Sequence, residues 1–159
     1  MNWALIGSIL IFYAILIGVN LPAPFLGLEF EEGDKPKLWY QPPGYVIPIV
    51  WFVLFTLLGT ARQHLLALGQ PELQYWLFAL ALLCATYAYY TLGLAKWTGI
   101  SALWYGLYGN LAVILFAVFV AAKLYPVSAT AALLTLPVAL WTTFATLIVV
   151  GEMRLEKLI

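Results

Sequence analysis

The sequence predicts an all-α protein, an integral membrane bundle of five transmembrane helices. Of its 159 residues, 65% are hydrophobic and only 9% are charged, whereas soluble domains carry about 25% charged residues. The apolar residues fall into five runs, each long enough to cross about 30 Å of hydrocarbon as a helix. Because these runs account for most of the chain, we expect a single transmembrane domain over residues 1–159.

Charged and turn-forming residues separate the five apolar runs. We expect helices over residues 3–23, 44–66, 73–94, 99–122 and 128–150. The first run is longer than the apolar core of a typical signal peptide and has no Lys or Arg before it, so we expect it to be retained as a helix. Three of the four connections are short, which places consecutive helices antiparallel and next to each other.

The first connection, residues 26–43, is long and contains four of the seven acidic residues, Glu29, Glu31, Glu32 and Asp34. Its second half is apolar and stiffened by prolines, which limits the entropy lost when it docks. Long loops in compact proteins are often functional. We therefore expect this loop to close over the bundle as a lid, with a passive linker as the alternative.

The distribution of basic residues predicts the orientation in the membrane. Five lie at the end that holds the first loop and the C-terminus: Lys35, Lys37, Lys96, Arg154 and Lys157. Two lie at the other end: Arg62 and Lys123. Because cytoplasmic segments are enriched in Lys and Arg, we expect the first loop and the C-terminus in the cytoplasm and the N-terminus outside.

Motifs for catalysis and metal binding are absent from the sequence. It has no HExxH, no CxxC, no Ser-His-Asp set and no glycine-rich phosphate loop. The lone His64 lies near a helix end, where an interfacial role is more common than metal ligation. The zero net charge and the lack of a basic tract argue against nucleic acid. We expect no metal, no required cofactor and a binding protein rather than an enzyme.

Aromatic residues make up 16% of the chain and include seven Trp. Those near the span ends fit the preference of Trp and Tyr for the membrane interface. Trp51, Trp104 and Trp141 lie deeper, where an indole N–H needs a partner or a cavity. These residues indicate an aromatic-walled pocket inside the bundle for a flat apolar ligand, and ordinary helix packing is the alternative.

Two prolines precede the deep tryptophans. Pro48 lies three residues before Trp51, and Pro137 lies four residues before Trp141. A proline inside a helix removes a hydrogen bond and tends to bend the helix. We expect two bent helices with a cavity between them, although membrane helices also tolerate proline for other reasons.

Asn110 is the only strongly polar residue near the middle of a predicted span. Asn in a membrane helix most often forms a hydrogen bond to a neighbouring helix. Gly106, one turn earlier, permits a close helix approach. We therefore favour a packing role for Asn110 over contact with a ligand.

Residues 35–51 resemble the signature of the TspO/translocator protein family, the tryptophan-rich sensory proteins. The matching residues in this segment are Lys35, Pro36, Trp39, Pro42, Pro43, Pro48 and Trp51. A second match lies in the last predicted helix and comprises Pro137, Trp141, Ala145 and Thr146, with Arg154 just beyond the helix. The number of helices, the long first loop and the chain length fit as well.

Three features depart from the family pattern. The third predicted helix reads Thr86 to Thr91 where the family has a stretch rich in Asn and Trp with a Pro. Val149 stands where the family commonly has Asn. The segment from Leu147 to Arg154 lacks the Tyr of the proposed cholesterol motif.

The resemblance implies a five-helix bundle, usually a homodimer, with a ligand pocket closed by the first loop. It implies a membrane receptor or sensor for porphyrins and other tetrapyrroles or for sterol-like lipids. The implied pocket residues are Trp39, Pro42, Pro43, Trp51, Trp141 and Ala145. Acidic groups of such a ligand would pair with Lys35, Lys37 or Arg62.

Two other functions stay open. One is an enzyme that degrades porphyrin in light, with Trp51 and Trp141 taking part in the photochemistry. The other is a structural or assembly subunit of a larger membrane complex. Steady product formation in light would indicate the first, and co-purifying partner proteins would indicate the second.

Overall fold

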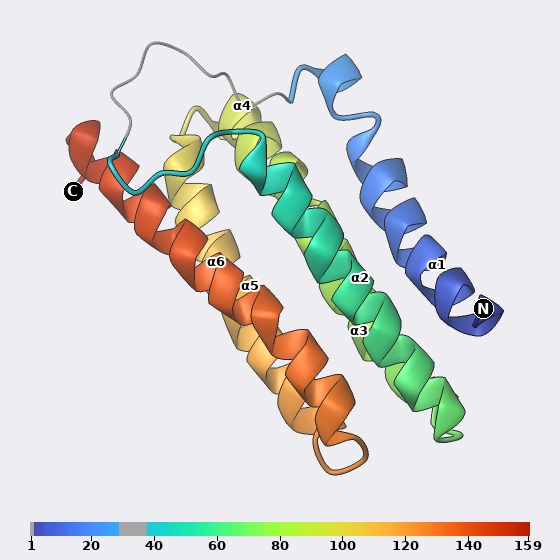
Figure 1. Ribbon diagram of the computed structural model, residues 1–159. Coiled ribbons are helices and arrows are strands. Elements are labelled where there is room, and N and C mark those ends of the chain that lie inside the picture. Colours follow the sequence, from blue (N-terminus) through green and yellow to red (C-terminus); the bar gives the residue numbers. More distant parts are fainter. Residues whose placement is uncertain (1, 29–37) are drawn as a thin grey trace.

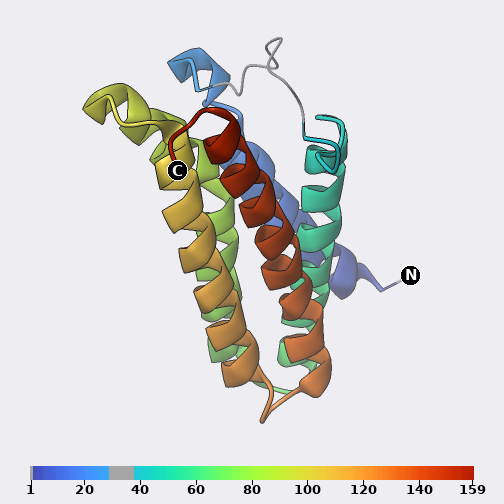
Figure 2. The same ribbon diagram turned by 90° about the vertical axis from the view of Figure 1, so that its left-hand side faces the viewer.

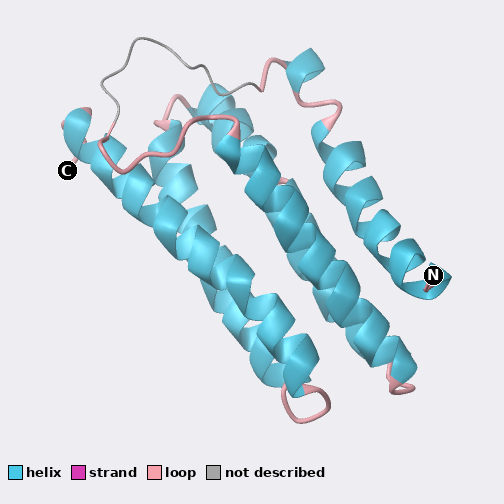
Figure 3. Cartoon of the chain, viewed as in Figure 1, coloured by secondary structure: helices cyan, strands magenta, loops and turns pink. Residues whose placement is uncertain are grey.

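The computed structural model describes residues 2–28 and 38–159, which form helices and connections without a strand (Figures 1 and 3). The helices are α1 (Trp3–Asn20), η1 (Pro24–Leu26), α2 (Val46–Ala67), η2 (Pro71–Leu73), α3 (Gln74–Ala85), η3 (Tyr89–Gly93), α4 (Leu94–Thr98), α5 (Ala102–Leu124) and α6 (Ala129–Leu155).

Within the described residues, four segments are long and apolar enough to span a membrane, and a bent pair makes a fifth if it is counted as one span, which agrees with the sequence prediction. Four are Trp3–Leu26 and the helices α2, α5 and α6. The fifth is a bent pair, Pro71–Ala85 and Tyr89–Thr98, whose halves meet at 51°. The all-α membrane bundle is therefore confirmed, and α6 extends five residues past the predicted end at residue 150.

Polar side chains cap the N-terminal ends of three of the spans. The first backbone N–H groups of a helix have no partner within the helix, and Asn and Ser accept hydrogen bonds from them. Asn2 caps α1 at Leu5 N, Ser101 caps α5 at Leu103 N, and Ser128 caps α6 at Ala131 N.

The spans form a closed ring. Each packs on its neighbours in the order α1, α2, α6, α5 and α3, and α3 packs again on α1. The short connections between α2 and η2 and between α5 and α6 lie at one end of the bundle (Figures 1 and 2). The loop from residue 38, α4 with its short connection to α5, and the C-terminus lie at the other end. The loop that precedes α2 reaches across to the end of α6, where the site described below is formed.

The third span is broken, so the prediction of one continuous helix over residues 73–94 is wrong. No proline causes the break. The Asn20 side chain of α1 donates a hydrogen bond to the carbonyl of Ala85, 3.2 Å away, where α3 ends. Tyr89 Oη donates to Val19 O at 2.6 Å, and a π-helical turn follows. Hydrogen bonds between two spans thus support the break.

The two prolines do not act as expected. Because α2 begins at Val46, Pro48 lies in its first turn, where a missing N–H removes no helical hydrogen bond. Pro137 lies inside α6, which continues unbroken on both sides of it. The prediction that Pro48 bends its helix is therefore wrong, and no break accompanies Pro137.

Candidate functional site

The end of the first loop is docked on the last two turns of α6. Tyr40 Oη donates a hydrogen bond to Leu147 O at 3.2 Å. Gln41 Nε2 donates to the carboxylate of Glu152 at 2.9 Å, and Gln41 Oε1 accepts from the backbone N–H of Leu38 at 3.3 Å. These bonds hold the loop against a helix more than 100 residues further along the chain.

Gly151 makes this docking possible. It is buried on α6 and faces the loop. A Cβ atom added here would lie 2.5 Å from Leu38 Cδ1 and against the hydroxyl of Tyr40, which is closer than real Cβ atoms approach other atoms. With the Leu38 and Tyr40 side chains in these positions, only glycine fits at residue 151.

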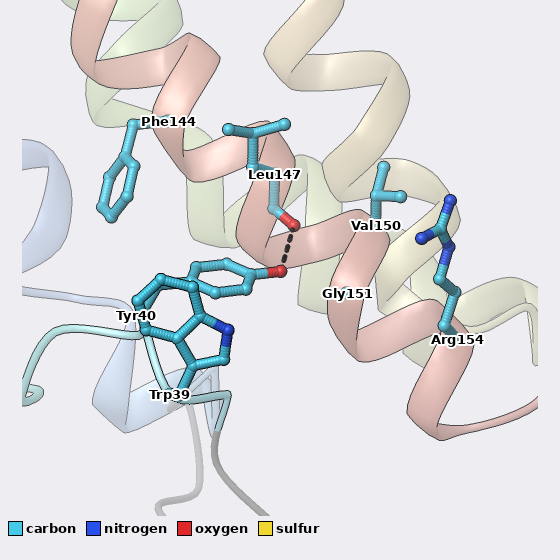
Figure 4. A pocket seen from close by; sticks show the side chains of 7 residues that line it. All are labelled: Trp39, Tyr40, Phe144, Leu147, Val150, Gly151 and Arg154. Carbon is cyan, nitrogen blue, oxygen red and sulfur yellow. Dashed lines mark hydrogen bonds between the residues drawn. The ribbon is translucent and has the colours of Figure 1, made fainter.

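An open groove of about 470 Å³ runs between the docked loop and α6 (Figure 4). Its lining residues are Trp39, Tyr40, Phe144, Leu147, Val150, Gly151 and Arg154. In Figure 4, Trp39 and Tyr40 lie together on one side, and the other residues follow α6 from Phe144 to Arg154. Volumes of about 300–1,000 Å³ are typical of sites for small molecules.

The groove combines an apolar wall with an exposed aromatic ring. Trp39 is 94% exposed although its indole is large and mostly apolar. Its ring meets that of Tyr40 edge-on, with the centroids 5.4 Å apart. Arg154 supplies a positive charge at the end of the groove. Such a surface can stack on a flat apolar molecule and attract an acidic group at its edge.

Of the expected pocket residues, only Trp39 lines the groove. Pro42 and Pro43 follow the docked segment and lead into α2. Trp51 is half-buried and packs edge-on against Phe55 of the same helix, with the ring centroids 6.2 Å apart.

Trp141 and Ala145 are half-buried residues of α6. The Trp141 ring lies 5.6 Å from the ring of Phe144, a residue of the groove wall. In the described part of the chain, Trp141 and Trp51 make no ring contact with each other. The structure thus brings Trp141 next to the groove and leaves Trp51 on a separate helix.

The sequence did not single out most of the α6 wall. Phe144, Leu147 and Val150 are ordinary membrane-helix residues, and nothing in their pattern separates a groove wall from a lipid-facing surface. Gly151 carried a usable signal, because glycine near the end of a helix often marks a close approach of backbone.

Of the basic residues proposed as ligand partners, Lys35 and Lys37 fall outside the described residues, and Arg62 does not line the groove. Arg62 turns into the bundle instead of reaching the interface, and it donates to Ser8 Oγ at 2.7 Å and to Gln74 Oε1 at 2.8 Å. No group of three potential metal ligands occurs within residues 2–28 and 38–159.

Comparisons with known proteins agree with the fold. The model of the TspO/MBR family matches residues 8–153. A relative from Chlorobaculum tepidum, named tryptophan-rich protein TspO, is 29% identical over 152 residues, which cover 83% of this chain and 87% of the relative. The family match includes all residues that line the groove except Arg154.

Proposed function

The chain belongs to the TspO/MBR family, and on this premise we propose that it binds a flat hydrophobic ligand at the aromatic loop end of the bundle. Its family makes it a membrane protein of the sensor or receptor type. The ligand is a porphyrin or another tetrapyrrole, or a sterol-like lipid. The observation that carries this proposal is the exposed Trp39 beside an apolar groove on α6.

Stacking provides the main attraction in this proposal. Trp39 and Tyr40 present aromatic rings, and Phe144, Leu147 and Val150 form the opposite wall. Stacking of a flat ring on an aromatic side chain contributes about 1–3 kcal/mol, by analogy with nucleic-acid bases. The docked loop fixes both aromatic residues in advance, which reduces the entropy cost of binding.

Arg154 determines which end of the ligand faces the membrane surface. It is exposed near the C-terminal end of α6, where a long basic side chain can reach the lipid headgroups. A carboxylate on the edge of a tetrapyrrole would pair with it, and the ring would extend along the helix toward Phe144.

The inner tryptophans extend this proposal into the bundle. Trp141 packs against Phe144, so a ligand that displaces the Phe144 ring gains access to Trp141. We retain the prediction that Trp141→Ala weakens tetrapyrrole binding about tenfold. The same loss in Trp51→Ala requires the ligand to extend past Trp141 as far as α2.

Titration with mesoporphyrin IX in detergent, followed by the shift of its main absorption band, tests the proposal. Trp39→Ala should raise the Kd about tenfold. Trp97→Ala is a matched control, because Trp97 is also a highly exposed tryptophan near the loop end but does not line the groove. Equal affinities of both variants and the unchanged protein would refute the proposed site.

A further inference from the structure

A second pocket lies at the opposite end of the bundle from the groove, between the start of α1 and the last turns of α2 (Figure 1). Its volume is about 210 Å³, and its lining residues are Asn2, Leu5, Thr60, Gln63, His64 and Ala67. Sites for whole small molecules typically measure about 300–1,000 Å³. Because the pocket is smaller and four of its six residues are polar, it suits a small polar group. It shares no residue with the groove between the loop and α6.

Arg62 supplies a positive charge next to this pocket. Its Nη1 donates to Ser8 Oγ at 2.7 Å, and its Nε donates to Gln74 Oε1 at 2.8 Å. Its guanidinium carbon lies 5.6 Å from the centre of the Phe78 ring. All three partners are neutral, and Glu72, the nearest acidic residue in the sequence, is exposed. A half-buried charge among neutral partners is not compensated, so this end of the bundle attracts an anion.

The Ser8 hydroxyl connects Arg62 to the pocket wall. Ser8 is only 1% exposed, and it donates to Gln63 Oε1 at 3.1 Å. Because a guanidinium can only donate, the single hydroxyl hydrogen of Ser8 is left for Gln63. The Gln63 amide is therefore held with its oxygen on Ser8, and its Nε2 amino group remains available to the pocket.

Asn2 presents the same end of its amide. Its Oδ1 accepts from the backbone N–H of Leu5 at 3.2 Å, so its Nδ2 amino group remains available. His64 is exposed and adds an imidazole, which has at least one N–H donor. Thr60 differs, because its hydroxyl donates to Thr56 O at 2.8 Å. Three side chains of the wall thus offer hydrogen-bond donors beside a positive charge, which favours a ligand with anionic acceptor oxygens.

We propose that this pocket binds a phosphate group, carried by a lipid headgroup or free in solution. Phosphate oxygens accept charge-assisted hydrogen bonds, which are stronger than those between neutral groups. The pocket lies where α1 begins and α2 ends, and phosphate is the anionic group that lipids present at the ends of membrane helices. The donors of Asn2, Gln63 and His64 hold the phosphate, and the charge of Arg62 attracts it.

Native mass spectrometry of the full chain in detergent tests this proposal with two lipids. Dioleoylphosphatidylglycerol carries a phosphate, and dioleoylglycerol has the same acyl chains without one. Asn2→Asp retains the oxygen that caps α1, and Gln63→Glu retains the oxygen that accepts from Ser8. Each replaces a donating amino group by a carboxylate oxygen, so each should weaken phosphatidylglycerol binding at least about tenfold and leave dioleoylglycerol binding unchanged.

Gln70→Glu is the matched control and should leave both affinities unchanged. It makes the same change of charge at the same end of the bundle, but Gln70 is exposed and does not line the pocket. An equal loss in Gln70→Glu and in the pocket variants would indicate a general effect of charge and overturn the proposal. Equal affinities of the unchanged protein for the two lipids would overturn it as well.

Inorganic phosphate distinguishes the two sources of the phosphate group. If it displaces phosphatidylglycerol from the unchanged protein, the site takes free phosphate as well as the headgroup. If it does not, the site is specific for the lipid, and the loss in the pocket variants still supports the proposal. Asn2→Asp lies at the surface and keeps the helix cap, so it provides the answer if Gln63→Glu does not fold.

Discussion

Replacing Gly151 by Ala should release the docked loop from α6 while leaving the bundle folded. The added Cβ would lie 2.5 Å from Leu38 Cδ1 and would also meet the Tyr40 hydroxyl. Both atoms belong to side chains of the docked loop, and the Tyr40 hydroxyl is already bonded to Leu147 O. We expect these side chains to move away from the helix and to draw the loop with them, so that the hydrogen bond from Tyr40 to Leu147 lengthens or breaks.

Two opposing contributions to the free energy determine the effect of Gly151→Ala. Loss of one neutral hydrogen bond costs about 0.5–1.5 kcal/mol, and loss of the bond from Gln41 to the charged Glu152 costs about 1.5–3 kcal/mol. Replacing Gly by Ala within a helix stabilises the helix by up to about 1 kcal/mol. The losses fall on the docked loop and exceed the gain in the helix, so docking of the loop weakens by at least about tenfold, because 1.4 kcal/mol corresponds to a factor of ten.

Hydrogen exchange measured by mass spectrometry separates the two effects. Peptides that cover residues 38–45 should exchange about tenfold faster in Gly151→Ala, and peptides of the α5 core should not change. Gly18→Ala is the control, because a Cβ at Gly18 in α1 meets no atom within 4 Å. Unchanged exchange of the loop in Gly151→Ala would refute the role assigned to this glycine.

Three further outcomes are expected. A cysteine added at the C-terminus should react with a membrane-impermeant reagent only from the cytoplasmic face. The native Cys84 is buried and should not contribute to the labelling. Reaction from outside alone would reverse the predicted orientation. Gly109→Ala should destabilise the protein by about 1–3 kcal/mol in detergent unfolding, because the Tyr90 ring occupies the space of the new methyl group; an unchanged unfolding midpoint would contradict this packing. Asn20→Leu should lower the free energy of unfolding by about 1–3 kcal/mol, because it leaves the Ala85 carbonyl unpaired. A stability equal to that of the native protein would show that this hydrogen bond does not support the break in the third span.

The spans could be predicted from the sequence because membrane helices depend on local apolar length. The break in the third span could not. It depends on Asn20 of α1, which hydrogen-bonds to Ala85 across 65 residues of chain. A sequence without proline in this stretch gives no local sign of the bend.

The site was predictable only where its residues belong to a recognisable motif. Trp39 stood out in the segment that resembles the family signature, and it lines the groove. The contact of Tyr40 with Leu147 joins residues 107 positions apart and depends on the fit at Gly151. A match of shape between a loop and a distant helix leaves no periodic pattern in the sequence.

The most direct test of ligand binding at the loop end is photocrosslinking with a mesoporphyrin that carries a diazirine on one propionate. Mass spectrometry of the labelled protein would locate the adducts. Binding in the groove predicts labels on residues 38–40 and 144–154, and competition by unmodified mesoporphyrin IX should remove them. Labels confined to the opposite end of the bundle, near Lys123, or labels that do not compete, would contradict the proposed function.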